Sequence, residues 1–191
     1  NRSQDVPTMS AVTSDNFAGG RKVAEFLIAS GHEKIGFCAG WEGASTQRDR
    51  EAGFLAALKD AGVELHCREV GNFKMEQARE ATLRMFAADP PDAVFVANDH
   101  MAIAVMDTIR SELGLDVPSD VSVVGYDDVP AASWPAFDLT TVRQPVNRMV
   151  AETVDILLAQ IAHATTPART VEIDGPLIVR GSARVPKGWT E

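Results

Sequence analysis

Short apolar runs alternate with segments of helical periodicity along most of this chain, and this alternation limits the possible folds more than any other feature. A short apolar run between turn residues predicts a buried strand, whereas apolar residues repeated every three or four positions predict an amphipathic helix. The expected strands are residues 34–39, 65–70, 93–97, 121–126 and 139–142. Because strands that alternate with helices form βαβ units, the sequence predicts an α/β fold with a Rossmann-like parallel sheet flanked by helices.

The expected helices are bounded by capping and helix-breaking residues. Asp15 can cap a helix that runs to Ser30, and Pro145 suits the first turn of a helix that runs to about residue 164. Two closing strands, 170–173 and 177–180, are expected after it. Glycines stand where other helices should end, at Gly31, Gly62 and Gly114.

Composition excludes several classes of function. The 191 residues carry a formal net charge of -9, and binding to phosphates would need clustered Lys and Arg, so this part is not expected to bind nucleic acid. Cys38 and Cys67 lack the spacing of a zinc or redox motif and are interpreted as buried thiols. No signal peptide is recognisable and no apolar run approaches the ~20 residues of a membrane span. The sequence therefore predicts a cytoplasmic protein without a membrane partner.

Polar residues gather directly after four of the expected strands. In open α/β sheets, ligands bind beyond the carboxyl ends of the strands, which lie at one edge. The four segments are Gly40-Trp41-Glu42, Gly71-Asn72-Phe73, Asn98-Asp99-His100 and Tyr126-Asp127-Asp128. The sequence therefore predicts a single ligand-binding rim formed by four loops.

The side chains near this rim suit a ligand with many hydroxyl groups. Arg50 lies near the start of the helix after the first strand and can donate a fork of hydrogen bonds, while Asp127 can accept them. Phe73 is the favoured aromatic surface, with Trp41 and Trp134 as further candidates. Two structural alternatives stay open. Arg50 could pair with a carboxylate on a solvated helix, and one of Asn98 and Asp99 is expected to cap the helix that follows.

Nothing in the sequence predicts catalysis, a metal or a cofactor. His100 stands beside Asp99, but no second His or Cys lies at ligand spacing. Ser45 and Thr46 lack the G-x-S-x-G elbow of a nucleophile. The Gly19-Gly20 pair lies inside an expected helix and does not follow a strand, so it is not a phosphate loop. We therefore expect a binding protein and not an enzyme.

Several short motifs follow one another in a fixed order along the chain. The similarity that they indicate covers residues 15 to 180. The motifs are residues 12–16 (VTSDN), 19–21 (GGR), 30–32 (SGH), 35–37 (IGF), 50–54 (REAGF), 97–99 (AND), 117–128 (VPSDVSVVGYDD) and 139–145 (LTTVRQP). In this order they resemble the effector domain of the lactose and galactose repressor family of bacterial transcription regulators. The resemblance implies a periplasmic-binding-protein-like fold of two lobes, with three crossings between them and a small sugar or sugar derivative in the cleft.

The resemblance also implies site residues and partners. The family's effector contacts correspond to Asp15 on one lobe and, on the other lobe, to Arg50, Phe73, Asn98 and Asp127. Asn72 stands where an aspartate is common, and Trp41 where a proline often follows glycine. We further expect a homodimer, formed through residues 99–113 and 129–137 of the carboxy-terminal lobe. Operator DNA would be bound only through a helix-turn-helix that this sequence lacks.

The same comparison predicts how the chain divides. Residues 1–33 are expected to be a remnant of the amino-terminal lobe, and residues 34–141 the carboxy-terminal effector-binding lobe. Residues 142–164 would form an amino-terminal-lobe helix after a crossover, and residues 165–191 the return strands and tail of the carboxy-terminal lobe. Two alternatives remain: a periplasmic sugar receptor with the same fold, and an α/β enzyme acting on a sugar phosphate. The second would need a basic phosphate cradle, which none of these loops offers.

Overall fold

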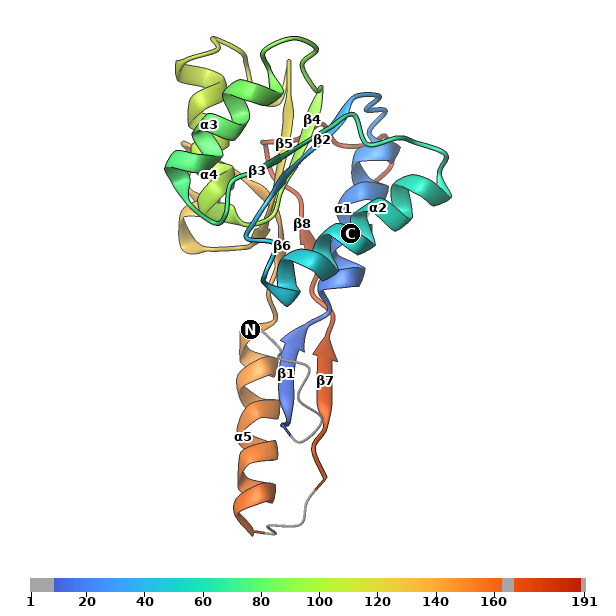
Figure 1. Cartoon of the computed structure of the whole chain (residues 1–191), viewed down its shortest axis with the longest axis vertical. Helices are drawn as coiled ribbons and strands as arrows, with labels where there is room; N and C mark the ends of the chain where they lie inside the picture. The colour runs from blue at the N-terminus through green and yellow to red at the C-terminus, as the bar shows by residue number, and fades with distance from the viewer. Residues whose placement is uncertain (1–8, 163–166, 190–191) are drawn as a thin grey trace.

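A computed structural model describes residues 9–162 and 167–189, which form a larger unit around a six-stranded sheet and a smaller unit below it (Figure 1). The sheet has the order β3-β2-β4-β5-β6-β8. Its first five strands are parallel, and β8 pairs with β6 in the antiparallel direction. The strands are β2 (Ile35–Ala39), β3 (Cys67–Val70), β4 (Ala93–Val96), β5 (Ser122–Asp127), β6 (Thr140–Arg143) and β8 (Leu177–Ile178).

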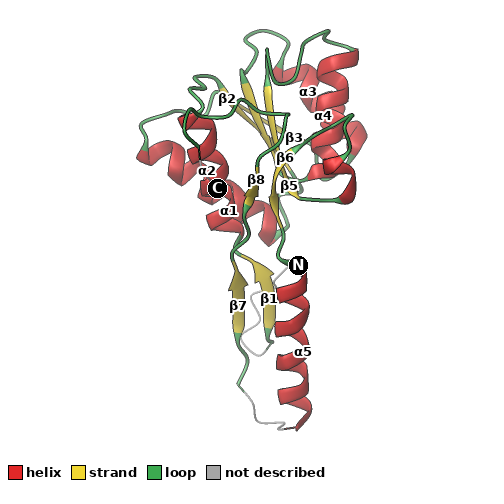
Figure 2. Ribbon diagram, turned by 180° about the vertical axis from the view of Figure 1, so that it is seen from behind, coloured by secondary structure: helices red, strands yellow, loops and turns green. Residues whose placement is uncertain are grey.

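Helices cover both faces of this sheet (Figure 2). On one face lie α1 (Asn16–Ala29) and α2 (Ser45–Asp60), and on the other lie α3 (Met75–Met85) and α4 (Asp99–Ser111). A short 3-10 helix, η1 (Pro130–Ser133), follows β5. Central strands covered on both faces have no solvent-facing side, which explains why their sequences are continuous apolar runs. Every residue of β2 and β4 is buried.

The smaller unit consists of two parallel strands and one helix. The strands are β1 (Ala11–Ser14) and β7 (Thr170–Ile173), and α5 (Val146–Ala162) packs beside them. Figure 1 shows that β1, α5 and β7 each connect to the larger unit through the narrow neck between the two units.

Glycines allow α1 and α2 to approach each other unusually closely. A Cβ atom added at Gly20 would lie 2.0 Å from the backbone oxygen of Arg50, and one added at Gly53 would lie 1.9 Å from that of Phe17. Gly19 faces Tyr126 in the same way, with 2.4 Å between the added carbon and the hydroxyl oxygen. The Gly19-Gly20 pair is therefore a packing feature of α1, as its position inside a helix suggested.

The fold class and the expected strands are confirmed, with strand ends shifted by up to two residues in the first five strands. The expected helix ends at Gly31, Gly62 and Gly114 also hold, since these residues adopt φ values of 77°, 70° and 66°. Asp15 caps α1 through a hydrogen bond from the Ala18 N–H to its Oδ1, at 2.8 Å.

The division of the chain differs from the expectation in two places. Residues 1–33 were assigned to the other lobe, but α1 packs against α2 on the large sheet, so the change of unit falls near Asp15. Residues 165–191 were assigned to the larger unit, but β7 pairs with β1 in the smaller one. The physical reason is the same in both cases: local periodicity identifies an element but not the surface on which it packs. The part of the prediction that concerns residues 1–8, 163–166 and 190–191 lies outside the described residues.

The close approach of α1 and α2 generates a stability prediction. Gly20→Ala would force a carbon into the Arg50 backbone, which cannot move aside, so we expect the free energy of unfolding to fall by about 3 kcal/mol. Gly31→Ala is the matched control, because no atom lies within 4 Å of its added carbon and its positive φ costs about 1–2 kcal/mol. Urea unfolding of both variants tests this. Equal losses for the two variants would contradict the close helix contact.

Candidate functional site

The loops that follow β3, β2, β4 and β5 lie along one edge of the sheet. These four strands are parallel neighbours in that order, so their carboxyl ends point the same way. Figure 1 shows that this edge faces the neck, where β6 continues directly toward α5. We call this edge the rim, defined by residues 40–42, 71–73, 98–100 and 126–128. The sequence predicted this arrangement from the position of the polar loops.

Arg50 is a buried hub beneath the rim. Its Nε donates to Asn16 Oδ1 at 2.9 Å, its Nη1 to the Ala97 carbonyl at 2.5 Å, and its Nη2 to Asp127 Oδ1 at 3.3 Å. The guanidinium carbon also lies 3.6 Å from the centroid of the Tyr126 ring, a cation–π geometry. With 3% of Arg50 exposed, much of its donor fork binds the protein itself. The alternative of a surface ion pair on a solvated helix is excluded.

Asp127 presents one occupied and one available carboxylate oxygen. Its Oδ1 accepts from Gln144 Nε2 at 2.6 Å as well as from Arg50. No hydrogen bond from residues 9–162 or 167–189 reaches its Oδ2, and 22% of the side chain is exposed. Burial raises the pKa of Asp127, while the Arg50 charge and the Gln144 hydrogen bond oppose this rise. Asp127 thus has an oxygen with which it can accept a hydrogen bond from a ligand.

Asp128 has different partners from Asp127. Its Oδ2 accepts from Arg143 Nε at 2.5 Å and its Oδ1 from Arg180 Nη2 at 2.7 Å. Only 8% of its side chain is exposed. Asp128 is therefore a structural anchor, and Asp127 is the acidic residue of the pair that faces the Arg50 hub.

Backbone strain concentrates at the rim. Among the described residues, the non-glycine positions with positive φ are Asn72 (53°), Phe73 (59°), Asp127 (125°), Asp128 (58°) and Asp138 (42°). All but Asp138 belong to the rim. Such conformations cost of order 1–3 kcal/mol each and persist where the surrounding structure holds them, which is common at binding sites.

The aromatic candidates lie at different places. The Phe73 ring rests on Gly40, where an added Cβ would lie 2.2 Å from it, so it joins the ends of β2 and β3. Trp41 is 49% exposed and folds over Gly43 of its own loop. Trp134 is 57% exposed and stacks on Phe137, with ring centroids 6.5 Å apart. Phe137 in turn lines a groove on the outer side of α4. The structure thus keeps Phe73 and Trp41 on the rim and places Trp134 beside α4.

Asn98 and Asp15 are both helix caps. Asn98 Oδ1 accepts from the Met101 N–H at 3.1 Å, which settles that Asn98, not Asp99, caps α4. Asp15 caps α1 and directly precedes Asn16, the Arg50 partner. Asp127 therefore contacts Arg50 directly, whereas Asp15 and Asn98 are the sequence neighbours of two residues that do, Asn16 and Ala97.

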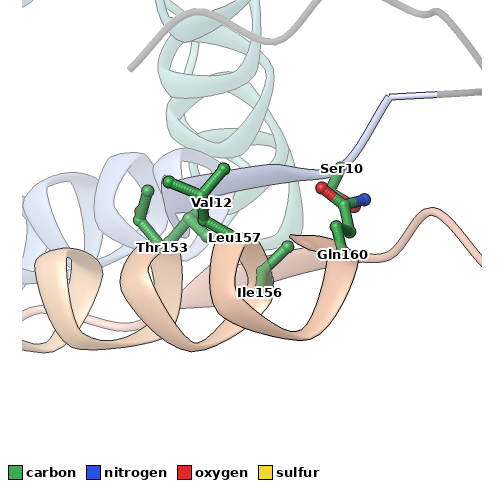
Figure 3. Close-up of a pocket in the computed structure, with 6 residues that line it drawn as sticks. All are labelled: Ser10, Val12, Thr153, Ile156, Leu157 and Gln160. Carbon is green, nitrogen blue, oxygen red and sulfur yellow. The ribbon is translucent and has the colours of Figure 1, made fainter. Parts of the chain in front are cut away.

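The smaller unit contains a separate shallow pocket between β1 and α5 (Figure 3). Its volume is about 140 Å³. Its lining is uncharged and half apolar, consisting of Ser10, Val12, Thr153, Ile156, Leu157 and Gln160. Gln160 donates to Ser10 Oγ at 2.9 Å and closes one end. The described residues contain no group of three or more His, Cys, Asp or Glu side chains that could hold a metal ion, and none of their helices is long and apolar enough to span a membrane.

Comparison with known proteins places this architecture in a family. Residues 24–183 match the model of the periplasmic binding protein-like domain. This chain belongs to that family. The HTH-type transcriptional repressor PurR of Mannheimia succiniciproducens is 34% identical over 181 residues, covering 93% of this chain and 54% of the relative. The chain therefore spans about half the length of that repressor.

Solved structures of regulators with this domain have the same fold. The transcriptional regulator CelR in complex with cellobiose superposes with a TM-score of 0.88 at 33% identity, covering 96% of this chain and 57% of that one. A dimeric Lac repressor with an 11-residue carboxy-terminal deletion superposes with a TM-score of 0.88 at 29% identity, covering 97% and 68%. The resemblance to the lactose repressor family is thereby confirmed.

Within this periplasmic-binding-protein-like domain, sequence reasoning missed three residues near Arg50. Asn16 and Gln144 supply hydrogen bonds around the hub, and Tyr126 supplies its ring. Gln144 lies inside the 139–145 motif, directly before Pro145, which was its only signal. No residue-type pattern distinguishes an internal partner of an arginine from an ordinary polar residue.

Asp99 is a buried acid beside the rim. It is fully buried, its Oδ1 accepts from Thr141 Oγ1 at 2.6 Å, and its Oδ2 accepts from the Val129 N–H at 2.9 Å. Burial raises its pKa to about 6 despite these two hydrogen bonds. An acid with a higher pKa in the folded state binds its proton more tightly there, so its contribution to stability is present below about pH 4 and is lost as the pH rises to about 6.

This pKa shift predicts a pH-dependent effect of Asp99→Asn. The asparagine can accept from the Val129 N–H and donate to Thr141 Oγ1 without a charge. Relative to wild type, we therefore expect the variant to gain on the order of 3 kcal/mol in free energy of unfolding between about pH 4 and pH 6. Denaturant unfolding across this range measures it. Asp155→Asn, on the exposed side of α5, is the control and should run parallel to wild type. Parallel curves for Asp99→Asn would contradict the raised pKa.

Proposed function

We propose that this chain is the effector-sensing and dimerisation part of a repressor of the lactose repressor family, and that it is not an enzyme. Its effector, a small sugar or sugar derivative, binds at the rim between the larger and smaller units. The observation that carries this proposal is the pairing of Asp127, with one oxygen available, and the buried Arg50 that holds its other oxygen.

The chemistry of the rim supports a polyhydroxylated ligand. A carboxylate oxygen can accept from sugar hydroxyls, and amide side chains can both donate and accept. Asp127 supplies the first, Asn72 and Asn98 the second, and Phe73 and Trp41 supply flat apolar surfaces. The superposition with a regulator bound to cellobiose supports the same ligand class.

The relatives support a proposed location and a proposed DNA partner. The matched relative is a transcriptional repressor, which favours a cytoplasmic regulator over the alternative of a periplasmic sugar receptor. This chain spans about half of that repressor and carries a net charge of -9. We propose that operator DNA is bound by a helix-turn-helix outside these residues, because an acidic surface repels phosphates.

Asp127→Asn tests the effector site more cleanly than truncation of Arg50, whose removal would leave buried acceptors unpaired. The asparagine Oδ1 can still accept from Gln144 and Arg50, while the available oxygen becomes a donor. We expect the variant to keep the fold and sugar affinity to fall by about 1.5–3 kcal/mol, the value of a hydrogen bond to a charged group.

Calorimetry against a panel of neutral and acidic sugars measures this change. Asp155→Asn removes the same charge from an exposed helix face and should bind as wild type does. A variant at Asp127 that keeps full affinity would contradict the assignment of this carboxylate.

A second copy of the chain is the proposed partner of the outer face of α3 and α4. A groove of about 280 Å³ lies there, and its lining includes Met75, Ile103, Ala104 and Phe137. Met75 is 49% exposed and Trp134, stacked on Phe137, is 57% exposed. Large apolar side chains in such exposed clusters are typical of protein interfaces. The superposition with a dimeric Lac repressor supports the same arrangement.

The proposed dimer predicts the effect of charged substitutions on this face. Combining Met75→Glu with Trp134→Glu would bury like charges across a two-fold interface, so we expect the protein to become a monomer. Light scattering measures the mass. Leu55→Glu, on α2 at the opposite face of the sheet, is the control and should leave the dimer intact. A double variant that remains dimeric would place the interface elsewhere.

A further inference from the structure

Two consecutive aspartates hold two consecutive residues at the point where the chain leaves the large sheet. Asp127 Oδ1 accepts from Gln144 Nε2 at 2.6 Å, and Asp128 Oδ2 accepts from Arg143 Nε at 2.5 Å. The backbone N–H of Gln144 also donates to the Asp127 carbonyl at 3.3 Å. The end of β5 and the residue after it are therefore hydrogen-bonded to two adjacent side chains between β6 and α5.

This segment is the second of three chain crossings in the neck, and the crossings are packed together. The Arg143 N–H donates to the Pro176 carbonyl at 2.9 Å, and the Asp15 N–H donates to the Ile173 carbonyl at 2.9 Å. A Cβ atom added at Gly175 would lie 2.1 Å from the Arg143 carbonyl oxygen. Gln144 lies two residues before Val146, where α5 begins. Figure 1 shows the crossings side by side.

The contacts of Asp127 and Asp128 with this segment differ in how they relate to the rest of the rim. Asp128 is bound by Arg143 and Arg180 and is nearly buried, so it holds the crossing in any state of the site. Asp127 shares one oxygen between Arg50 of the larger unit and Gln144 of the crossing, and its other oxygen is available. A change in charge or hydrogen bonding at Asp127 therefore acts directly on Gln144.

We infer that Gln144 is a positioning residue that couples the state of the Asp127 carboxylate to the start of α5, and so to the orientation of the smaller unit. This inference rests on the proposed function for the identity of the ligand, but not for the coupling itself. A ligand hydroxyl that donates to Asp127 withdraws negative charge from the oxygen to which Gln144 donates. The weakened contact would loosen the crossing at Gln144 while Asp128 keeps Arg143 in place.

The coupling can be tested without any ligand, by following the titration of Asp127. The groups that face this carboxylate are Arg50 from α2, Asp99 and His100 from α4, Tyr126 and Asp128 on either side of it, and Gln144. Gln144→Met has a similar size but no donor. Since the lost hydrogen bond favoured the charged form, the pKa of Asp127 should rise further in this variant, as measured by carboxyl NMR.

The same spectra report on the helix. In wild type, the amide signals of residues 146–149 should titrate together with Asp127, and in Gln144→Met they should lose this step. Gln160→Met, on the same helix and hydrogen-bonded to Ser10, is the matched control and should behave as wild type. Should Gln144→Met fail to fold, Gln144→Glu places a second carboxylate beside Asp127 and should raise its pKa as well. An unchanged Asp127 titration, or retained titration of the helix amides in Gln144→Met, would overturn the inference.

Calorimetry with the sugar panel separates this inference from the proposed function. If a sugar binds wild type, we expect its affinity to rise about tenfold in Gln144→Met, where the ligand no longer has to weaken the contact between Gln144 and Asp127, and to be unaltered in Gln160→Met. Equal affinities in both variants would count against a role of Gln144 in sensing. If no sugar binds wild type, the proposed ligand class is wrong, while the titration still decides whether Gln144 couples Asp127 to α5.

Discussion

The rest of the candidate site depends on the hydrogen bonds and the ion pair that the buried guanidinium of Arg50 makes. Removing a charge from water is costly unless hydrogen bonds and an opposite charge replace the lost hydration. Here Asn16 of α1, the Ala97 carbonyl after β4 and Asp127 after β5 supply those partners. Because these partners come from different elements, satisfying Arg50 holds the start of α1, the end of β4 and the end of β5 in one arrangement.

This arrangement is possible because glycines bring α1 close to α2. Gly20 and Gly53 leave no room for even one added carbon at the helix contact, so the start of α1 lies close enough for Asn16 to reach Arg50. The helix packing and the electrostatics of the site are therefore parts of one structure. The strained loops at Phe73 and Asp127 add conformations that only a well-packed frame can hold.

The neck connects the larger unit, which contains Arg50 and the rim, to the smaller unit. Asp127 contacts Arg50 and the crossing with the same oxygen, whereas Asp128 contacts Arg143 of the crossing and Arg180 with different oxygens. A binding site placed where the chain passes between two units can affect their relative orientation through very few bonds. Such an effect requires only that the ligand makes different contacts in two orientations of the units. The large sheet itself does not need to change. The matched relatives, which are transcriptional repressors, make a response of this kind functionally meaningful.

The sequence alone determined the α/β class and the edge of the sheet at which the polar loops gather, and it predicted several residues of the candidate site. Strand and helix periods are local, and the carboxyl ends of parallel strands share an edge, so the loops ending at Phe73, Asn98 and Asp127 could be located without a structure. The tertiary structure decided what these side chains contact. It showed that Arg50 is mostly satisfied by the protein, that Trp134 lies beside α4, and that α1 belongs to the larger unit. Hydrogen-bond partners and packing surfaces join residues far apart in the chain, such as Asn16, Arg50, Asp127 and Gln144, and a local pattern carries no record of which distant groups will meet.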